Sequence, residues 1–458
     1  MLAFQSGRTK SNCAGISRRT ALKAGFLGIA GLTQADYGRL KAESGTSTKK
    51  KSVILLWLDG GPSQLETFDP KPDAPVEYRG PFGVAKTRTP GVNLSALMPE
   101  TAKRFDKVAL VRSVYHNTGD HFAGAHWMTT GRFGSTSVNQ AQKYPSVGSF
   151  VSRINGPNVA GLPAYVGLPS AETVYLYPGY MGAAYLGGAY NPFEVDREVK
   201  YLGANDTRRI RSPKWIGTLA SKDADLIANR TELLKHFDTL RSDIDASGTA
   251  ADMDRYRQQA YDLMLGTKAR DAFDLDKEDV RTADRYGTGP WGRYTLMARR
   301  LIEAGVTFVT VDMPHWDDHS NIESGHGLKV PVVDRAVGAL LDDLGERGML
   351  DDVLIVVMGE FGRTPRINTG QPGIPVPGRD HWGNAMSVLM AGGGLNGGVV
   401  VGRTNNKAEH PVERALKPAD ILATVYHVLG IDPRLTFKDH TGRPIAILDE
   451  GEPIRELV

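Results

Sequence analysis

Histidines and carboxylates gather in several short segments that lie far apart in the sequence. Imidazole and carboxylate together are the ligands that zinc, manganese and iron prefer in proteins, whereas calcium takes oxygen ligands and is not excluded. The pattern therefore predicts a site for one or two divalent metal ions. The candidate ligands are Asp59, His315, Asp317, His319, Glu360, Asp380 and His381.

Two metal ions about 4 Å apart can clamp the attacking and leaving oxygens of a phosphate or sulfate ester. Two arginines, Arg363 and Arg379, stand near the candidate ligands in the sequence, and a guanidinium group can grip an oxyanion in a bidentate way. We therefore expect a catalytic role for Arg363. Substrate-binding roles are expected for Arg379, Asn117 and His126.

Each of these residues also has a plainer interpretation. An aspartate that ends a strand, such as Asp59, often caps a turn or a helix. The segment HWDDH at residues 315–319 can be polar turn chemistry, and Arg363 can pair with Glu360 for structural reasons. A single histidine is usually a hydrogen-bonded surface or core residue. The joint pattern, rather than any one residue, favours a metal centre.

Alternating apolar strands and amphipathic helices must position these side chains. The predicted strands are residues 53–58, 306–311 and 353–357. The predicted helices are residues 291–304, 332–348 and 418–429. Helix followed by strand predicts an α/β fold with a central, mostly parallel sheet flanked by helices. Ligands bind such sheets beyond the carboxyl ends of the strands, which is where the candidate residues stand.

One domain is predicted over residues 52–458, with an inserted region at about 148–287. The first part of that region is rich in glycine, tyrosine and proline and is interpreted as long loops. Its second part, residues 213–274, is charged and helical.

The first 35 residues resemble an export signal. Two arginines precede a short apolar stretch, residues 24–32, in SRRTALKAGFLGIAGL, and this stretch is too short to span a bilayer. The order Ser-Arg-Arg-x-x-Leu-Lys resembles the twin-arginine signal, although Ala21 stands where phenylalanine is preferred. We expect residues 1–35 to be a signal peptide read by the twin-arginine export machinery and residues 36–51 to be a linker. The mature protein would be periplasmic or on the cell surface, without a membrane span; an uncleaved basic helix is the alternative.

Charge and cysteine content exclude several classes of function. Removing the five basic residues of the first 35 from the total of 55 leaves 50 basic against 52 acidic residues, so the body is near neutral. Nothing therefore favours nucleic acid as a partner. The single cysteine, Cys13, lies in the leader, which excludes a disulfide, a thiolate nucleophile and a cysteine-based zinc site in the body.

The motifs VILLWLDGGPSQLETFDPKP, WDDH, GEFGRTPRIN and GRDHW closely resemble the bacterial family known as domain of unknown function 1501, over nearly the whole chain from residue 51. That family looks like a branch of the alkaline phosphatase and sulfatase superfamily. The resemblance implies a three-layer sandwich with a one- or two-metal site at the strand ends. It implies metal ligands at Asp59, at His315 or Asp317 together with His319, at Glu360 and at His381.

The sequence departs from the superfamily at two positions. Phe361 stands where the superfamily has a ligating histidine, and His121 falls at or near the position of the hydroxyl or modified-cysteine nucleophile. Thr118 is the nearest hydroxyl. The resemblance therefore implies a catalytic role for His121. One reconciliation has His121 replace the missing ligand, so that a metal-bound hydroxide attacks. Asp59, His121 and Glu360 would then hold one ion, and Asp317, His319 and His381 another.

The expected function is an exported, metal-dependent hydrolase of phosphate or sulfate esters, acting on a small molecule or a polysaccharide. The absent nucleophile keeps an alternative open, a catalytically degenerate carbohydrate-binding or scaffold protein on the same fold. A metal-dependent isomerase or transferase is a third possibility. The retained clustering of acids and histidines favours the hydrolase, because buried charge is costly unless it is used or paired.

Overall fold

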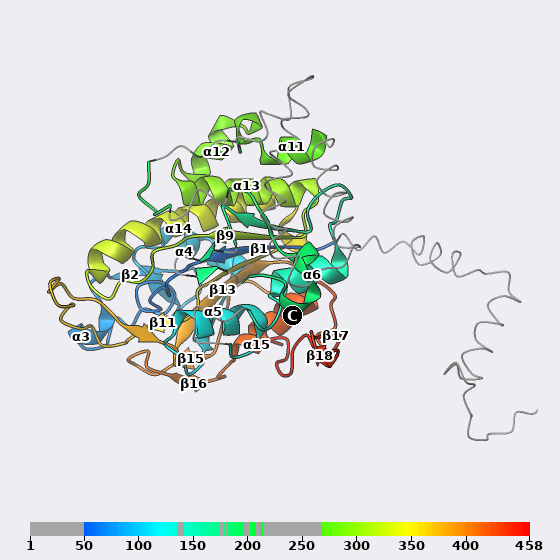
Figure 1. Cartoon of the computed structure of the whole chain (residues 1–458). Coiled ribbons are helices and arrows are strands. Elements are labelled where there is room, and N and C mark those ends of the chain that lie inside the picture. The colour runs from blue at the N-terminus through cyan, green and yellow to red at the C-terminus, as the bar shows by residue number, and fades with distance from the viewer. Residues whose placement is uncertain are drawn as a thin grey trace, which may run out of the picture. The chain divides into compact units, whose positions relative to one another are not determined.

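A mixed sheet of eight strands forms the centre of the computed structural model (Figure 1). The strands lie in the order β14 (Val399–Val401), β4 (Val108–Val114), β13 (Met386–Gly392), β10 (Val353–Met358), β1 (Ser52–Trp57), β9 (Phe308–Asp312), β5 (Tyr165–Leu168) and β8 (Phe193–Glu194). Strand β13 runs antiparallel to both of its neighbours, and every other pair in this sheet is parallel.

Helices cover both faces of the sheet, because the buried strands are apolar on both sides. Strand β1 sends Ile54 and Leu56 into one core and Val53 and Leu55 into the other. The first core is closed by α4 (Pro99–Lys103), α11 (Thr267–Phe273), α12 (Val280–Tyr286), α13 (Pro290–Ala304) and α14 (Ile322–Glu346). The second is closed by α5 (His121–Thr130), α6 (Val147–Asn155) and α15 (Pro418–Val428), as Figure 1 shows. The predicted three-layer α/β sandwich is confirmed.

The predicted strands and helices are present, with one large difference in a boundary. Strands β1, β9 and β10 and helices α13 and α15 begin and end within two residues of the prediction. Helix α14 begins at Ile322, ten residues before the predicted start, because it continues through Pro331. Proline removes one backbone hydrogen bond from a helix interior, which made residue 332 look like a helix start.

The interpretation of residues 148–287 as an insertion is wrong in part. Strands β5 and β8 come from this region and extend the central sheet beyond β9. They are short, and β5 contains Gly167, where a Cβ atom would lie 2.4 Å from the backbone nitrogen of Ala171. Short, glycine-containing strands give little periodicity, which is why the sequence favoured loops here.

Small elements complete the chain. These are α3 (Val76–Arg79) and the two-stranded ribbons β2 (Val84–Lys86) with β3 (Asn93–Ser95), β6 (Thr173–Val174) with β7 (Tyr177–Pro178), β11 (Gly362–Arg363) with β12 (His381–Trp382), β15 (Arg403–Thr404) with β16 (Pro411–Glu413), and β17 (Thr436–Lys438) with β18 (Pro444–Ala446).

The structure describes residues 50–134, 142–171, 173–174, 177–178, 181–196, 202–207, 210, 212–213 and 267–458. Residues 51–458 group into one unit. The predicted signal peptide and nearly all of the linker lie outside the described residues, as does most of the predicted helical region 213–274. No described helix is long and apolar enough to cross a membrane.

Candidate metal centre

The topology of the sheet brings the predicted site residues to one edge. Strands β1, β9 and β10 are parallel neighbours, so the loops that follow them leave from the same side. Strand β4 runs in the same direction and leads into α5, which begins at His121. Strand β13 is antiparallel and therefore begins at this edge, and just before it β12 carries His381 opposite Arg363 of β11.

The segment Asp59-Gly60-Gly61 ends β1 in a turn that larger residues could not form. Gly60 and Gly61 have φ angles of 110° and 77°, in the left-handed region that favours glycine. A Cβ atom on Gly60 would lie 2.7 Å from the backbone nitrogen of Trp316, and one on Gly61 2.4 Å from the ring of Phe361. The backbone amide of Gly60 donates to the Glu360 carboxylate at 2.9 Å. These glycines therefore let the loops after β1, β9 and β10 touch.

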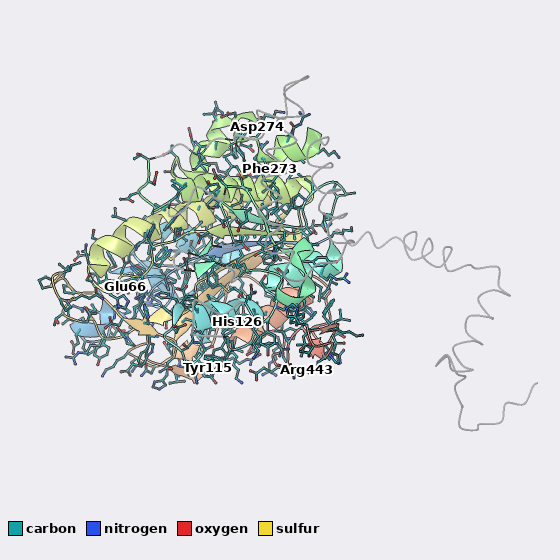
Figure 2. The ribbon with its side chains drawn as sticks, in the orientation of Figure 1. Glu66, Tyr115, His126, Phe273, Asp274 and Arg443 are labelled. Carbon is teal, nitrogen blue, oxygen red and sulfur yellow. The ribbon has the colours of Figure 1, made fainter. Side chains whose placement is uncertain are left out.

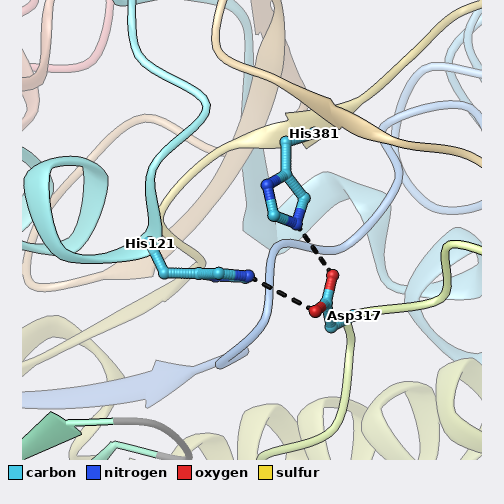
Figure 3. A group of neighbouring side chains, drawn as sticks. All are labelled: His121, Asp317 and His381. Carbon is cyan, nitrogen blue, oxygen red and sulfur yellow. Dashed lines mark hydrogen bonds and ion pairs between the residues drawn. The ribbon is translucent and has the colours of Figure 1, made fainter. Parts of the chain in front are cut away.

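Three imidazoles and one carboxylate converge at this edge, and Figure 3 draws three of these four side chains, those of His121, Asp317 and His381. Asp317 Oδ1 lies 2.9 Å from His381 Nε2 and 3.0 Å from His319 Nε2. The two Nε2 atoms of His319 and His381 are 2.9 Å apart. His121 Nε2 lies 3.4 Å from Asp317 Oδ2. We call these four side chains the imidazole cluster.

Each imidazole of the cluster is held through its other nitrogen. His121 Nδ1 lies 2.6 Å from Glu360 Oε1, and His319 Nδ1 lies 2.7 Å from Asp380 Oδ1. His381 Nδ1 lies 2.7 Å from the carbonyl oxygen of Gly119. A carbonyl can only accept, and the two carboxylates also accept from neighbours, so we assign the proton to Nδ1 in all three rings. This leaves every Nε2 atom directed into the cluster, which is the second-shell arrangement of metal-ligating histidines.

The residues of the cluster fit a divalent cation. Ligand atoms about 2.0 to 2.2 Å from a tetrahedral zinc ion lie about 3.3 to 3.6 Å apart, so small outward shifts of the observed contacts would admit one. His121 Nε2 is buried without a hydrogen-bond partner of good geometry among the described residues. The ligand atoms of His121, Asp317 and His381 all lie within 4.8 Å of one another. The geometry favours one shared site for this cluster rather than the division expected from the sequence, which placed His121 with Asp59 and Glu360.

Protons occupy the cluster of the metal-free molecule. Burial disfavours the imidazolium of His121, but the carboxylates of Asp317 and Glu360 outweigh it and raise its pKa to about 10. A hydrogen bond to Asp317 raises the pKa of His319, against burial. Burial favours the neutral form of Asp317, but hydrogen bonds from His121, His319 and His381 hold its pKa far below the usual range. The cluster thus carries positive charge that a cation would replace.

A second group of carboxylates lies directly behind His121. Asp59 and Glu360 are 1% and 0% exposed, and Asp312, which ends β9, is 8% exposed. Burial raises the pKa of Asp312 well above its ordinary value, and the charges of Asp59 and Glu360 raise it further, so these three acids are neighbours. Asp312 Oδ1 is buried without a hydrogen-bond partner among the described residues. Sequence reasoning did not single out Asp312, although its place at a strand end is the signal that selected Asp59.

Arg363 is placed to hold Asp317. Its side chain is 0% exposed and donates to Asp317 Oδ1 at 2.6 Å. It also donates to the carbonyls of Gly61 at 2.8 Å, Trp316 at 3.2 Å and Arg379 at 3.2 Å, and to that of Gly60. A guanidinium with these partners positions the loops and does not face a substrate. The alternative interpretation, a structural pair with Glu360, is not found, because Arg363 pairs with Asp317.

Arg379 lies away from the solvent as well. Its guanidinium is 0% exposed and pairs with Glu66 at 2.8 Å, while donating to the carbonyls of Thr364 and Tyr78. This buried pair fixes the loop before β12 against the loop after β1. The expectation that Arg379 binds substrate is corrected, because its donors are used inside the protein.

His126 and His315 lie outside the cluster. His126, labelled in Figure 2, is on α5 and bonds to the carbonyl of Arg132 at 2.9 Å; burial lowers its pKa to about 4. His315 has a φ of 78°, and a Cβ atom added to Gly203 would lie 3.6 Å from its ring, so the ring faces the loop at residues 203–205. The left-handed backbone at His315 turns it away and presents Asp317 instead. His126 as a substrate contact and His315 as a ligand are therefore not supported.

The remaining candidates lie at the rim or behind it. Asp380 is half-exposed and touches His319, and Asn117 is exposed in the loop before α5. The hydroxyl of Thr118 accepts from the backbone of Asp120 at 3.1 Å. The ring of Phe361 lies beside the cluster, 4.9 Å from the ring of His121 and 4.6 Å from that of His381.

A buried network that sequence reasoning missed supports Asp317. Its neighbour Asp318 pairs with Lys329 at 2.7 Å and with His326 Nδ1 at 2.8 Å. His326 Nε2 accepts from the backbone amide of Ser63 at 3.0 Å. Helix α14 therefore anchors the loop after β9 to the loop after β1. Its sequence signal is the spacing of His326 and Lys329, which places both on one helix face, but the predicted helix began only at residue 332.

Comparison with known protein families identifies the same family as the sequence motifs did. The family described as "Protein of unknown function (DUF1501)" matches residues 50–458. Among curated proteins, none matches the sequence significantly.

The solved structures that resemble this one include sulfatases and alkaline phosphatase-like proteins. The PsFucS1 sulfatase from Pseudoalteromonas sp. is 12% identical with a TM-score of 0.39, over 86% of this chain and 70% of its own. An alkaline phosphatase superfamily protein from Vibrio parahaemolyticus is 11% identical with a TM-score of 0.39, over 84% and 67%. The lipoteichoic acid synthase LtaP from Listeria monocytogenes is 14% identical with a TM-score of 0.35, over 90% and 77%. These resemblances are loose, so function has to come from the site itself.

Proposed function

The chain belongs to the DUF1501 family, and from the geometry of its site we propose that it is an exported, metal-dependent hydrolase of phosphate or sulfate esters. The observation that carries this proposal is the imidazole cluster. The Nε2 atoms of three imidazoles each lie 2.9 to 3.4 Å from an oxygen of Asp317. Each imidazole is oriented by an acceptor at its Nδ1 atom. Such a donor set suits zinc, manganese or iron.

The residues that would hold the cation are His121, Asp317, His319 and His381. A divalent ion bound there would polarise an ester oxygen and lower the pKa of a water molecule that it binds. The second carboxylate group, Asp59 with Asp312 and Glu360, offers oxygen ligands for a further ion and contacts His121 through Glu360. We therefore propose one or two bound ions. Calcium is an alternative at the oxygen-rich group of Asp59, Asp312 and Glu360.

No described side chain at the site is placed as a nucleophile, so we propose that water attacks the ester. By resemblance, the superfamily's nucleophile position falls at or near His121, the first residue of α5, whose Nδ1 is bound to Glu360. Thr118 is buried, and its hydroxyl oxygen already accepts from Asp120. No cysteine lies in the body. We therefore propose direct attack by a water molecule, without a covalent intermediate on the enzyme.

Arg363 acts behind Asp317 and not on the substrate. Its guanidinium fixes the orientation of the Asp317 carboxylate, which faces His381. The positive charge of Arg363 also favours the ionised form of that carboxylate. Asn117, exposed at the rim, is our candidate substrate contact. The substrate is proposed to be a small-molecule or polysaccharide ester, and the export signal at residues 1–35 is proposed to direct the folded protein through the twin-arginine machinery.

One observation favours a second function. The position of the superfamily nucleophile is taken by His121, so the site can bind a cation and an anionic sugar without turning over an ester. A catalytically degenerate carbohydrate-binding or scaffold protein is therefore the alternative.

The test combines metal content with turnover. Purified wild type and His121→Ala are each analysed for bound transition metal and assayed with an aryl phosphate and an aryl sulfate. We expect wild type to bind metal and cleave one of the two esters, and His121→Ala to lose both properties. Metal binding without turnover of either ester would support the alternative, and the absence of bound metal in wild type would end both metal-based proposals.

A further inference from the structure

The side chain of Asn368 uses every hydrogen bond it can make at the edge of the imidazole cluster. Its Nδ2 donates to the carbonyl of His319 at 3.0 Å and to Asp380 Oδ2 at 3.2 Å. Its Oδ1 accepts from the backbone amides of Gly370 and Gly378, each at 2.9 Å. An amide offers two donors and two acceptor lone pairs, so Asn368 is fully satisfied.

Asp380 connects Asn368 to the cluster. The oxygen of Asp380 that does not touch Asn368 holds His319 Nδ1 at 2.7 Å. The backbone of Asp380 is tied to Thr364 by two hydrogen bonds, but its side chain is 52% exposed. Besides His319, Asn368 is therefore what fixes the rotamer of this exposed carboxylate. The chain of contacts Asn368–Asp380–His319 ends on an Nε2 atom of the cluster.

The same asparagine closes the loop formed by residues 369–377. Its backbone amide donates to the carbonyl of Gly378 at 2.9 Å, and Asn321 donates to the carbonyl of Val376 at 3.2 Å. Gly378 packs against the backbone of His319, since a Cβ atom there would lie 2.3 Å from the carbonyl oxygen of that residue. The tip of the loop is exposed, with Ile374 at 51% and Val376 at 41%. The base of this loop and the backbone of His319 therefore share one side chain.

We propose that Asn368 is a positioning residue of the metal centre. It holds Asp380 in the orientation that fixes His319, and it joins the exposed loop 369–377 to that histidine. This inference rests on the proposed function, because it requires that the cluster binds a cation. It predicts that Asn368 affects metal affinity through Asp380 and loop closure through its own oxygen.

Metal affinity of a double-mutant cycle tests the first part. Zinc is titrated into metal-free wild type, Asn368→Ala, Asp380→Ala and the double variant in competition with a chromogenic chelator. Loss of an outer-shell partner weakens metal binding by about 10- to 100-fold. We expect that range for Asp380→Ala and about the lower end of it for Asn368→Ala. The double variant should bind as weakly as Asp380→Ala alone, because Asn368 acts on the metal centre through Asp380 and has no further effect once that carboxylate is gone.

Loop closure provides a readout that does not need the metal. Asn368→Asp keeps the acceptor for Gly370 and Gly378 but loses both donor bonds and places a charge against Asp380. Hydrogen exchange of these two glycine amides in the metal-free protein should rise in Asn368→Ala and stay near the wild-type rate in Asn368→Asp. Both variants should nevertheless bind zinc more weakly.

Asn405 supplies a matched control. Its Oδ1 accepts from the backbone amides of Lys407 and Glu409, and its Nδ2 donates to the Glu409 side chain at 2.6 Å, so it organises a turn of similar kind outside the cluster. Asn405→Ala should bind zinc like wild type, and thermal unfolding checks that each variant is folded.

The outcomes separate the two proposals. Unchanged zinc affinity in folded Asn368→Ala, or independent effects in the double variant, overturns the role of Asn368 while metal binding by wild type still stands. Wild type that binds zinc but cleaves no ester overturns the hydrolase and leaves the role of Asn368 intact. Wild type that binds no zinc overturns both.

Discussion

His319 and His381 face each other with their Nε2 atoms 2.9 Å apart, and Asp317 Oδ1 lies within 3.0 Å of both. Both Nδ1 atoms are held by acceptors, so both Nε2 atoms are turned toward Asp317 Oδ1 and toward each other. A cation bound among these three atoms would take the place of the hydrogen bonds to the carboxylate.

Replacing His381 by alanine should remove metal binding. His381 contributes one of the four converging side chains, and direct ligands matter more than outer-shell partners, so zinc affinity should fall by more than about 100-fold. Chelator competition measures the change. His427→Ala, which alters an exposed histidine on α15, serves as the control and should bind zinc like wild type. Equal affinities for His381→Ala and wild type would contradict the assignment.

The metal-free protein should become less stable as the pH rises from neutral to about 10. The pKa of His121 is raised to about 10 in the folded protein, against about 6.5 when unfolded. The folded state therefore holds more protons in this window, so the free energy of unfolding falls with increasing pH and is fully retained only below about 6.5. Urea denaturation at pH 7 and pH 9.5 measures the slope. His121→Gln should flatten it, and an equally steep slope in that variant would refute the explanation.

Acid should destabilise the protein through a different histidine. Burial lowers the pKa of His126 to about 4. Between pH 6.5 and pH 4 this histidine is therefore protonated in the unfolded state and neutral in the folded state. The stability that this residue contributes is present above pH 6.5 and is lost as the pH falls through 4, to an extent of about 2 to 3 kcal/mol. His126→Asn, which can still donate to the carbonyl of Arg132, should show a smaller loss of unfolding free energy between pH 7 and pH 4.5 by urea denaturation. A loss as large as that of wild type would show that other groups are responsible.

Substitution of Arg363 by methionine should destabilise the fold and not only reduce activity. Arg363 is 0% exposed and holds Asp317 together with the carbonyls of three loops. Removing one partner of a buried ion pair costs about 3 to 5 kcal/mol. Denaturant unfolding measures this, with Arg434→Met on the surface as a control that should leave the midpoint unchanged. A stable Arg363→Met with normal zinc affinity and a raised KM alone would instead indicate a substrate contact.

Thr118→Val should keep most of the ester turnover. The hydroxyl of Thr118 serves the backbone of Asp120, so its loss should perturb the loop only slightly. Removing a covalent nucleophile typically lowers kcat by about a factor of 10³ or more. The proposed attack by water therefore predicts a decrease of less than about tenfold, measured as kcat with the aryl ester that wild type cleaves. A loss of a thousandfold would make Thr118 the nucleophile.

Much of the fold is determined by local sequence. Strands β1, β9 and β10 are apolar and β-branched, and α13 and α15 have helical spacing, so both kinds of element could be located before the structure was known. Parallel strands end at a common edge, and this alone placed Asp59, Glu360 and the segment around Asp317 in one neighbourhood. The types of side chain also determined the class of ligand, since imidazole with carboxylate indicates a transition metal.

Only the tertiary structure decided which side chains meet and in what role. The left-handed backbone at His315 turns its ring away and presents Asp317, and this depends on contacts with a distant loop. Arg363 and Arg379 are motif arginines alike, yet each is buried against partners, Asp317 and Glu66, that no spacing could indicate. Sequence pattern reports which element a residue belongs to, whereas the direction of its side chain is set by backbone dihedrals and by partners that folding brings from elsewhere in the chain.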